Sequence, residues 1–328
     1  MKRALLILPF ILFITLESCR NDFDVNAPYE DVYVLNCILR NDKPVQYAII
    51  SKNVYTENGV PPTSNSTAQN IKGANVEIYY NDSVFVMRDT TIEVTDSGGV
   101  TQVNCYCIKN LVLQPGKVVR IEATVQGKKL ESTTQIPEIT FTKFSLNFPQ
   151  AFKSGYATKP NYSWNWTGDS GDNSNILSLP QLEIFYKKYE GGSYVDKKIL
   201  VPLALYFTYD ENNNLIPVNV ELSFNNFCIT TLETVNKTMQ AISGDDPNKS
   251  EYKITKVLFN VIGLDPDLSK FYSAYNTYNE DFSVKLRQTD YSNIEGGKGI
   301  FGVAYNFSKS LVVDSLYVKS FGYQYDPK

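Results

Sequence analysis

The amino-acid sequence predicts a mainly β protein made of two β-sandwich domains in series, of the immunoglobulin/transthyretin-like type, with one or two short helices in the second. Apolar and polar residues alternate strictly in several short segments, for example at 74–79 and 118–126, and such alternation is typical of a strand with one buried face. Turn residues such as Asn81-Asp82 separate these segments at short intervals. The chain has 328 residues, 43% of them hydrophobic, which is enough for two packed cores.

The first domain is expected at residues 31–137. Its strands begin near residue 32 and continue at 46–51, 74–79, 83–86 and 118–126. A turn at Gly127-Lys128 should return the chain into a further strand. The polar stretch at 57–70 has too few apolar residues for a core element, and Pro137 ends the domain.

The second domain is expected at residues 138–328, as a β-sandwich with helical insertions. Its strands are predicted at 162–166, 181–189, 194–201, 203–209, 215–222, 282–287, 300–307 and 311–321. Helices are predicted at 230–242 and 266–278. Asp265 would cap the second helix, and Pro266 occupies its first position, where a missing N–H is tolerated.

The first residues predict export and lipid anchoring. Residues 1–18 have a positive start, an apolar run of 13 residues and a small residue before the cleavage point, which together indicate a signal peptide. The run is too short to span a bilayer, which takes about 20 residues. The tetrapeptide that ends at Cys19 resembles a bacterial lipobox, so we expect Cys19 to be diacylated and residues 19–30 to form a lipidated tether. The alternative is an ordinary signal peptide with an incidental cysteine.

Composition excludes several classes of function. The chain contains no histidine, which excludes Ser-His-Asp and Cys-His catalysis and histidine-ligated metal sites. The formal net charge is −4 without a basic block, so a nucleic-acid partner is not expected. No pair of carboxylates can be placed for glycosidase chemistry. The sequence therefore predicts a protein that is not an enzyme and that uses no cofactor.

Four cysteines remain besides Cys19: Cys37, Cys105, Cys107 and Cys228. Export permits disulfides, but the sequence does not choose among the pairings. Cys105 and Cys107 would point to the same side of a strand, which disfavours a bridge between them. The alternative reading is that all four are small buried apolar residues.

Two motifs have a ligand-binding and a structural interpretation. Residues 297–302 spell G-x-G-x-x-G, but a strand rather than a helix should follow, which disfavours a nucleotide site. Asp210, Asn212 and Asn214 have the spacing of a calcium loop. Leu215 stands where that loop requires glycine, so a hairpin turn is the better interpretation and no metal site is predicted.

Several segments together resemble one family. Residues 292–302, SNIEGGKGIFG, are similar to the "SNIEGGLGIFG" signature of Bacteroidota outer-membrane lipoproteins that carry domain of unknown function 4249, with Lys298 in place of the common leucine. Residues 73–78 resemble the family's GA-x-V-x-I strand, and 113–137 resemble its Y-x-L-x-V … sett-x-P segment. The helix at 267–278 matches the aromatic helix that precedes the signature. The resemblance covers nearly the whole mature chain.

This resemblance implies a function but no catalytic residues. Members of the family are commonly associated with TonB-dependent outer-membrane transporters. We therefore expect a non-enzymatic accessory or ligand-capturing subunit of such a transporter, or of another barrel complex. A structural or assembly lipoprotein of the outer membrane is the alternative, and an exported hydrolase is a third. The signature is expected to act as a structural and docking loop through Asn293, Glu295, Gly296, Gly297, Gly299 and Gly302.

The signature also gives local expectations. Gly296 and Gly297 should adopt backbone angles that a β-carbon disfavours. Asn293 and Glu295 should satisfy exposed N–H groups of the turn. Ile300 and Phe301 should start a strand with one side chain in the core and the other outside.

Short motifs in the sequence give expectations for localisation and for modification. Asp22 and Asp24 resemble the acidic export tag of surface lipoproteins, which favours the cell surface, with the periplasmic face as the alternative. Three tripeptides resemble a Bacteroidota O-glycosylation motif, and their acceptors would be Ser83, Thr90 and Ser315. A turn hydroxyl bonded to its own backbone is the alternative at each.

Overall fold

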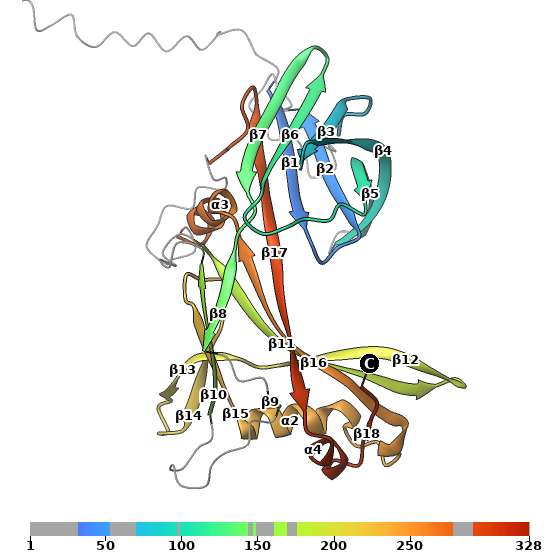
Figure 1. Ribbon diagram of the computed structural model, residues 1–328, viewed down its shortest axis with the longest axis vertical. Coiled ribbons are helices and arrows are strands. Elements are labelled where there is room, and N and C mark those ends of the chain that lie inside the picture. The colour runs from blue at the N-terminus through green and yellow to red at the C-terminus, as the bar shows by residue number, and fades with distance from the viewer. Residues whose placement is uncertain are drawn as a thin grey trace, which may run out of the picture.

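The computed structural model describes residues 32–52, 70–96, 99–143, 147–148, 161–168, 176–277 and 291–327. Within these ranges the chain is mainly β, with a 13-stranded sheet, a five-stranded sheet and three short α-helices (Figure 1). The prediction of a mainly β fold with a few short helices is confirmed.

The strands are β1 (Tyr33–Arg40), β2 (Val45–Lys52), β3 (Asn75–Tyr80), β4 (Ser83–Asp96), β5 (Gly99–Lys109), β6 (Val118–Val125), β7 (Lys128–Gln135), β8 (Ile139–Lys143), β9 (Asn147–Phe148), β10 (Asn161–Gly168), β11 (Ser178–Glu190), β12 (Ser193–Val201), β13 (Ala204–Tyr209), β14 (Leu215–Asn219), β15 (Phe227–Thr231), β16 (Tyr252–Leu264), β17 (Lys298–Val313) and β18 (Gln324–Tyr325). The helices are α2 (Leu232–Ser243), α3 (Pro266–Thr277) and α4 (Ser315–Ser320), and η2 (Lys249–Glu251) is a short 3-10 turn.

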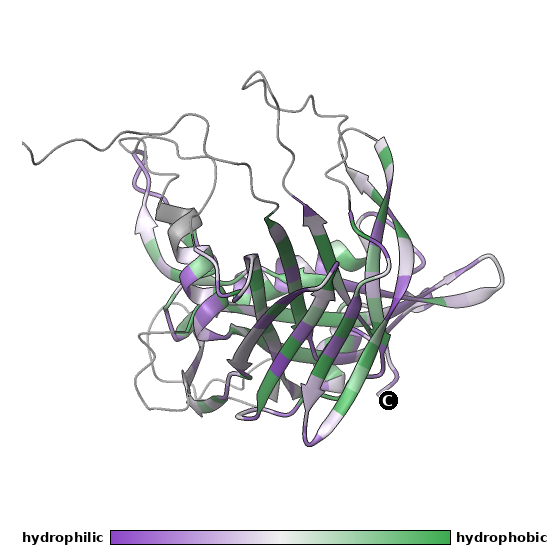
Figure 2. Cartoon of the chain, turned by 90° about the horizontal axis from the view of Figure 1, so that it is seen from above, coloured by the Kyte–Doolittle hydropathy of each residue, from purple (hydrophilic) through white to green (hydrophobic). Residues whose placement is uncertain are grey.

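The N-terminal unit has two layers that share the long strand β4. One layer has the order β17-β1-β2-β5-β4, and the other has the order β4-β3-β6-β7. β4 pairs with β3 up to Met87 and with β5 from Arg88 onward, so it passes from one layer to the other. Alternate residues point inward and form the core, including the fully buried Leu35, Ile50 and Ile78. Figure 2 shows hydrophobic and hydrophilic residues alternating along these strands, as the period of two requires.

Strand β17 joins the two halves of the molecule (Figure 1). Its first half pairs in parallel with β1, from Lys298 to Ala304. Its second half pairs in antiparallel with β16, from Ala304 to Leu311. At about 3.3 Å per residue, 16 residues span roughly 50 Å. The first half of β17 therefore belongs to the N-terminal unit, although it lies in sequence far beyond the predicted domain boundary at 137/138.

The C-terminal unit packs β12-β11-β16-β17 against the five-stranded sheet β14-β13-β15-β10-β8 and against helix α2. Its core is aromatic. Trp164 stacks on Phe259 with ring centroids 5.0 Å apart, and Trp166 and Tyr162 lie beside them. The stacked arrangement of these rings is one of the preferred geometries of aromatic pairs.

The structure corrects two local predictions and leaves a third untested. The strand predicted at 311–321 ends at Val313, because Asp314 caps helix α4 with its carboxylate accepting from Leu316 N at 2.8 Å. The turn predicted at Gly127-Lys128 lies at Gln126-Gly127, where both residues have positive φ, of 48° and 83°. The strand predicted at 282–287 lies outside the described residues.

Candidate functional site

The signature segment closes the N-terminal unit. Glu295 N donates to Glu131 O at 2.8 Å, and Glu131 N donates to Glu295 O at 3.1 Å. This pair of backbone hydrogen bonds attaches the start of the β17 segment to β7, at the opposite end of the sheet order from β1. The layers of the sandwich are thereby linked at both sides, which satisfies backbone groups that an open edge would leave unpaired.

Asn293 fixes the shape of this segment. Its Nδ2 donates to Phe301 O at 2.7 Å, and its Oδ1 accepts from Phe301 N at 2.9 Å. The amide side chain thus pairs with the backbone of β17 as a neighbouring strand would. The expectation that Asn293 satisfies an N–H group is confirmed. Glu295 does so through its backbone carbonyl, and its side chain is exposed.

Gly296 and Gly297 lie against backbone atoms of other strands. Gly296 has φ of +78°, and a β-carbon there would lie 2.1 Å from Lys129 O. Gly297 has no positive φ, but a β-carbon would lie 2.6 Å from Tyr33 O. The predicted backbone strain is therefore confirmed at Gly296 and wrong at Gly297, where close packing is the reason for glycine.

Gly299 and Gly302 on β17 also lie so close to other residues that a β-carbon would not fit. A β-carbon on Gly299, whose φ is +115°, would lie 2.1 Å from Leu35 O on β1. A β-carbon on Gly302 would lie 2.4 Å from Leu268 Cγ and 2.7 Å from Asp265 Oδ2. Gly302 therefore leaves the space in which the start of helix α3 reaches the backbone of β17.

Asp265 joins helix α3 to β17. Its side chain is fully buried, its Oδ1 accepts from Leu268 N at 2.8 Å as a helix cap, and its Oδ2 accepts from Val303 N. Its own N–H donates to Val303 O at 3.0 Å. Burial raises the pKa of Asp265 to about 6, and the two backbone donors partly oppose this shift. The predicted capping role is confirmed, whereas the link to β17 was not predicted.

Ile300 and Phe301 are both buried, so the expectation that one of them faces outward is wrong. Phe301 lies in the core of the N-terminal unit. Ile300 lies in a third apolar cluster with Leu264 and Leu268, because helix α3 covers the outer side of β17 at this point.

This geometry makes the signature a structural junction. The N–H groups of Glu295, Ile300 and Phe301 already donate to Glu131 O, Asn36 Oδ1 and Asn293 Oδ1. A phosphate loop needs such groups free and a helix after the glycines, but here the strand β17 follows. Of residues 292–302, only Glu295, Gly296 and Lys298 are exposed, and a docking role stays a prediction for this small surface.

The other predicted sites are scattered. Cys19 lies outside the described residues. Ser83 is exposed at the start of β4, and Thr90 is half-buried further along the same strand. Ser315 is half-buried in the first turn of α4, directly after the capping Asp314. Their use as glycosylation acceptors stays a prediction.

The four cysteines Cys37, Cys105, Cys107 and Cys228 are free thiols. Burial raises the pKa of Cys37 to about 12 and raises that of Cys228 as well. The reading of these two as buried apolar residues fits this environment.

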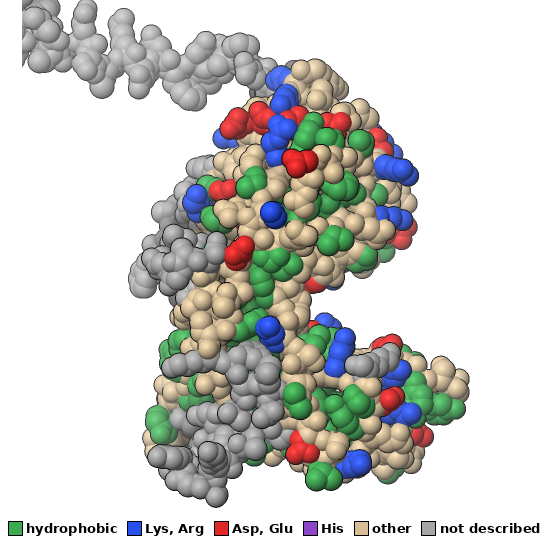
Figure 3. Space-filling model, viewed as in Figure 1, with side chains coloured by type: hydrophobic (Ala, Val, Ile, Leu, Met, Phe, Trp, Pro, Cys, Tyr) green, Lys and Arg blue, Asp and Glu red, His purple; other side chains and the backbone are tan. Residues whose placement is uncertain are grey.

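A second candidate site, which the sequence did not indicate, lies in the notch between the two units. We define the notch as the hollow between the β1–β2 turn, residues 41–44, and the projecting hairpin β11–β12 (Figure 3). Asn41 Nδ2 donates to Asn306 O at 2.9 Å, and Asn306 N donates to Asn41 Oδ1 at 2.6 Å. These bonds fix the turn on β17 at the inner end of the notch.

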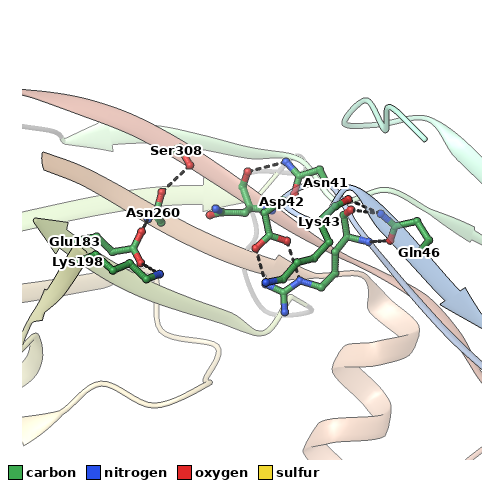
Figure 4. A network of polar contacts seen from close by, with 10 residues as sticks. Asn41, Asp42, Lys43, Gln46, Glu183, Lys198, Asn260 and Ser308 are labelled. Carbon is green, nitrogen blue, oxygen red and sulfur yellow. Dashed lines mark hydrogen bonds and ion pairs between the residues drawn. The ribbon is translucent and has the colours of Figure 1, made fainter. Parts of the chain in front are cut away.

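A row of polar side chains crosses the sheet beside this turn (Figure 4). Lys198 Nζ donates to Glu183 Oε1, Asn260 Nδ2 donates to Glu183 Oε2 at 2.7 Å, and Ser308 Oγ donates to Asn260 Oδ1 at 2.6 Å. Glu183 and Asn260 are buried. The row links β12, β11, β16 and β17 on the face opposite the aromatic core, and its buried polar atoms satisfy one another.

The projecting part of this sheet is called the wing here: β11, β12 and the first half of β16. Its core face packs toward α2 and α4, and its other face, the wing face, is turned toward the notch (Figures 1 and 3). Strand alternation and the pairing register place four lysines on the wing face: Lys187, Lys198, Lys253 and Lys256. Ring contacts agree, since Lys256 Nζ lies 4.7 Å from the Phe185 ring centroid and Lys253 Nζ lies 4.2 Å from that of Tyr194.

The described ranges contain neither a membrane-spanning helix nor a metal-binding cluster. No helix in them is both long and apolar enough to cross a membrane. They also contain no group of three or more Cys, Asp or Glu side chains arranged to hold a metal ion.

Comparison with known proteins gives one assignment. No curated protein matches the chain. A family model described as a domain of unknown function, DUF4249, matches residues 20–310. This span includes the signature, helix α3 and most of both units, and it ends before helix α4; it agrees with the resemblance seen in the sequence. The chain belongs to the DUF4249 family.

Proposed function

We propose that this protein is a lipid-anchored outer-membrane lipoprotein that acts as a non-enzymatic accessory or ligand-capturing subunit of a TonB-dependent transporter. The anchor would be Cys19, with the folded chain on the cell surface. The wing would be the contact region for the transporter or its cargo.

The wing is the observation that carries this proposal. It projects from the C-terminal unit at the far end of β17 and places a lysine-rich face on an open notch (Figures 1 and 3). The chain enters the fold at the other end, where Val34 pairs with Lys298. The 13 Cα–Cα steps from Cys19 to Val32 can reach at most about 45 Å. A lipid on Cys19 would thus hold the end near Lys298 close to the membrane and leave the wing accessible at the other.

Co-purification tests the proposal directly. The full chain, tagged after Lys328, would be expressed in its native host, extracted from outer membranes in mild detergent and analysed by mass spectrometry. A TonB-dependent transporter in stoichiometric amount is the expected result. Assembly machinery in its place would favour the alternative of a structural lipoprotein, and the purified protein alone would argue against both.

Enzymatic activity is tested separately. The purified full chain would be incubated with ester, glycoside and peptide substrates. The proposal expects no turnover above that of a buffer blank. Turnover that persists through repeated purification would revive the hydrolase interpretation.

A further inference from the structure

Lysines on the two faces of the wing differ in whether they form ion pairs with carboxylates. On the core side, Lys197 Nζ lies 2.6 Å from Glu190 Oε1, and Lys188 Nζ lies 3.5 Å from Glu190 Oε1 and 3.8 Å from Asp246 Oδ2. Each lysine there has a carboxylate partner. Surface pairs of this kind neutralise charge although they add little stability.

The wing face lacks this compensation. Lys198 pairs with Glu183, but no carboxylate of the described residues lies within ion-pair distance of Lys187, Lys253 or Lys256. Asp196 stands opposite Lys187 across β11 and β12, yet the two side chains form no ion pair. The face therefore keeps an excess of positive charge in a protein whose net charge is −4, and such a local excess attracts anionic partners.

Exposed apolar side chains lie on the same face as these lysines. Leu200 on β12 is 51% exposed, and Val312 on β17 is 63% exposed. Val312 lies between Leu311 and Val313, which are both buried in the core, so alternation turns it to the wing-face side. Cations and exposed aliphatic groups thus occur on one surface, a combination that suits a partner with both carboxylates and apolar side chains.

We propose that the wing face binds an acidic, extended polypeptide segment in which carboxylates alternate with aliphatic residues. This inference rests on the proposed accessory function and names the chemistry of the partner contact. The carboxylates would pair with Lys187, Lys253 and Lys256, and the aliphatic residues would cover Leu200. Burial of the three ammonium groups by a partner is favourable only if that partner supplies the missing negative charges.

The same features disfavour a glycan or a lipid surface. Ammonium groups lie over the rings of Phe185 and Tyr194, which reduces the aromatic surface open to a sugar. A lipid surface would have to meet the wing at the end of β17 farthest from the point where the chain enters the fold. A polypeptide segment requires neither.

Binding of a synthetic peptide tests the proposal. The probe is a fluorescein-labelled decapeptide of alternating Glu and Val, and the protein is the full chain in detergent, measured by fluorescence anisotropy. Saturable binding that weakens as salt is raised is expected, together with little binding of the Gln-Val and Lys-Val peptides. Equal binding of the Gln-Val peptide would overturn the assignment, and so would stronger binding to phosphatidylglycerol vesicles or a sulfated glycan.

Matched variants locate the contact. The triple variant K187Q/K253Q/K256Q should weaken peptide binding about tenfold, whereas K187R/K253R/K256R should retain it within about threefold. The control K237Q/K249Q/K319Q removes the same charge from exposed sites outside the wing and should change binding less than twofold. Equal losses in the wing and control variants would mean that net charge, and not the wing face, carries the binding.

Co-purification separates this inference from the proposed function. Loss of both the peptide and the transporter in K187Q/K253Q/K256Q, with an unchanged melting temperature, would support both statements. Retention of the transporter by that variant would leave the accessory function intact and overturn the wing face as its contact. Absence of a transporter from the wild-type preparation, with specific peptide binding retained, would overturn only the accessory function.

Discussion

The substitution Gly302→Ala tests the junction between helix α3 and strand β17. A β-carbon at residue 302 would lie 2.4 Å from Leu268 Cγ and 2.7 Å from Asp265 Oδ2. Both neighbours are fully buried, so neither can move into solvent. The added methyl group should therefore displace the carboxylate that accepts from Val303 N and push the first turn of α3 away from β17.

The expected loss of stability can be estimated from these contacts. Overpacking of a buried site costs about 1–3 kcal/mol, and weakening a hydrogen bond to a charged group costs about 1.5–3 kcal/mol. Since the two effects share the same atoms, we expect a combined loss of about 3–4 kcal/mol. At about 2.1 cal/mol/K of unfolding entropy per residue, a chain of 328 residues should lose roughly 4–6 °C in Tm, measurable by circular dichroism.

A control substitution and a double-mutant cycle with Asp265→Ala make the test specific. Gly192→Ala also introduces a methyl group, at a φ of +91° but with no atom within 4 Å, so it should cost only about 1 kcal/mol. If Gly302→Ala acts through Asp265, its effect should shrink markedly in the Asp265→Ala background. A Gly302→Ala protein as stable as Gly192→Ala, or a fully additive cycle, would refute the reasoning.

Three further predictions concern pH, anchoring and modification. Burial raises the pKa of Asp265 to about 6, whereas the pKa of an aspartate in an unfolded chain is about 3.9. The contribution of Asp265 to stability is therefore present below pH 4 and is lost as the pH rises through 6, and the free energy of unfolding should fall by roughly 3 kcal/mol over this range. Urea titrations of Asp265→Asn should lack that fall. Cys19→Ala should release the protein into the soluble fraction after cell breakage, and a variant that pellets with outer membranes like the wild type would contradict anchoring through Cys19. Glycosylation at Ser83, Thr90 or Ser315 should raise the intact mass above that of the lipidated polypeptide, and an equal mass would exclude all three.

Local elements were predictable because their causes are local. Alternation of apolar and polar residues located β3 and β6, and the pair Asp265-Pro266 located the start of helix α3 within the sequence. These features depend on side chains within a few residues of one another. The helix that replaces the predicted strand at 315–320 had a local signal too, the capping residue Asp314, which the apolar residues around it outweighed.

Long-range pairing was not predictable in the same way. Nothing near residues 298–304 indicates that they pair with β1, more than 260 positions earlier in the chain. The close approaches of Gly297 to Tyr33 and of Gly302 to Asp265 depend on that pairing. The excess charge of the wing face has the same origin, since it appears only when the neighbours of Lys256 and Lys253 on β11 are known.

The two candidate sites differ in how freely their residues can vary, and this difference bears on function. In the signature, glycines lie against main-chain oxygens of Lys129, Tyr33 and Leu35. Main-chain atoms are present whatever side chain a neighbouring residue carries, so such contacts require glycine in any sequence with this fold. The glycines of the signature thus follow from the closure of the fold, whether or not its exposed residues also contact a partner. The lysines of the wing face have no such requirement, since Lys198 and Lys256 are exposed and Lys187 and Lys253 are half-buried. A surface of this kind can be adapted to one partner without disturbing the fold, which is why we place partner recognition on the wing and structural closure at the signature.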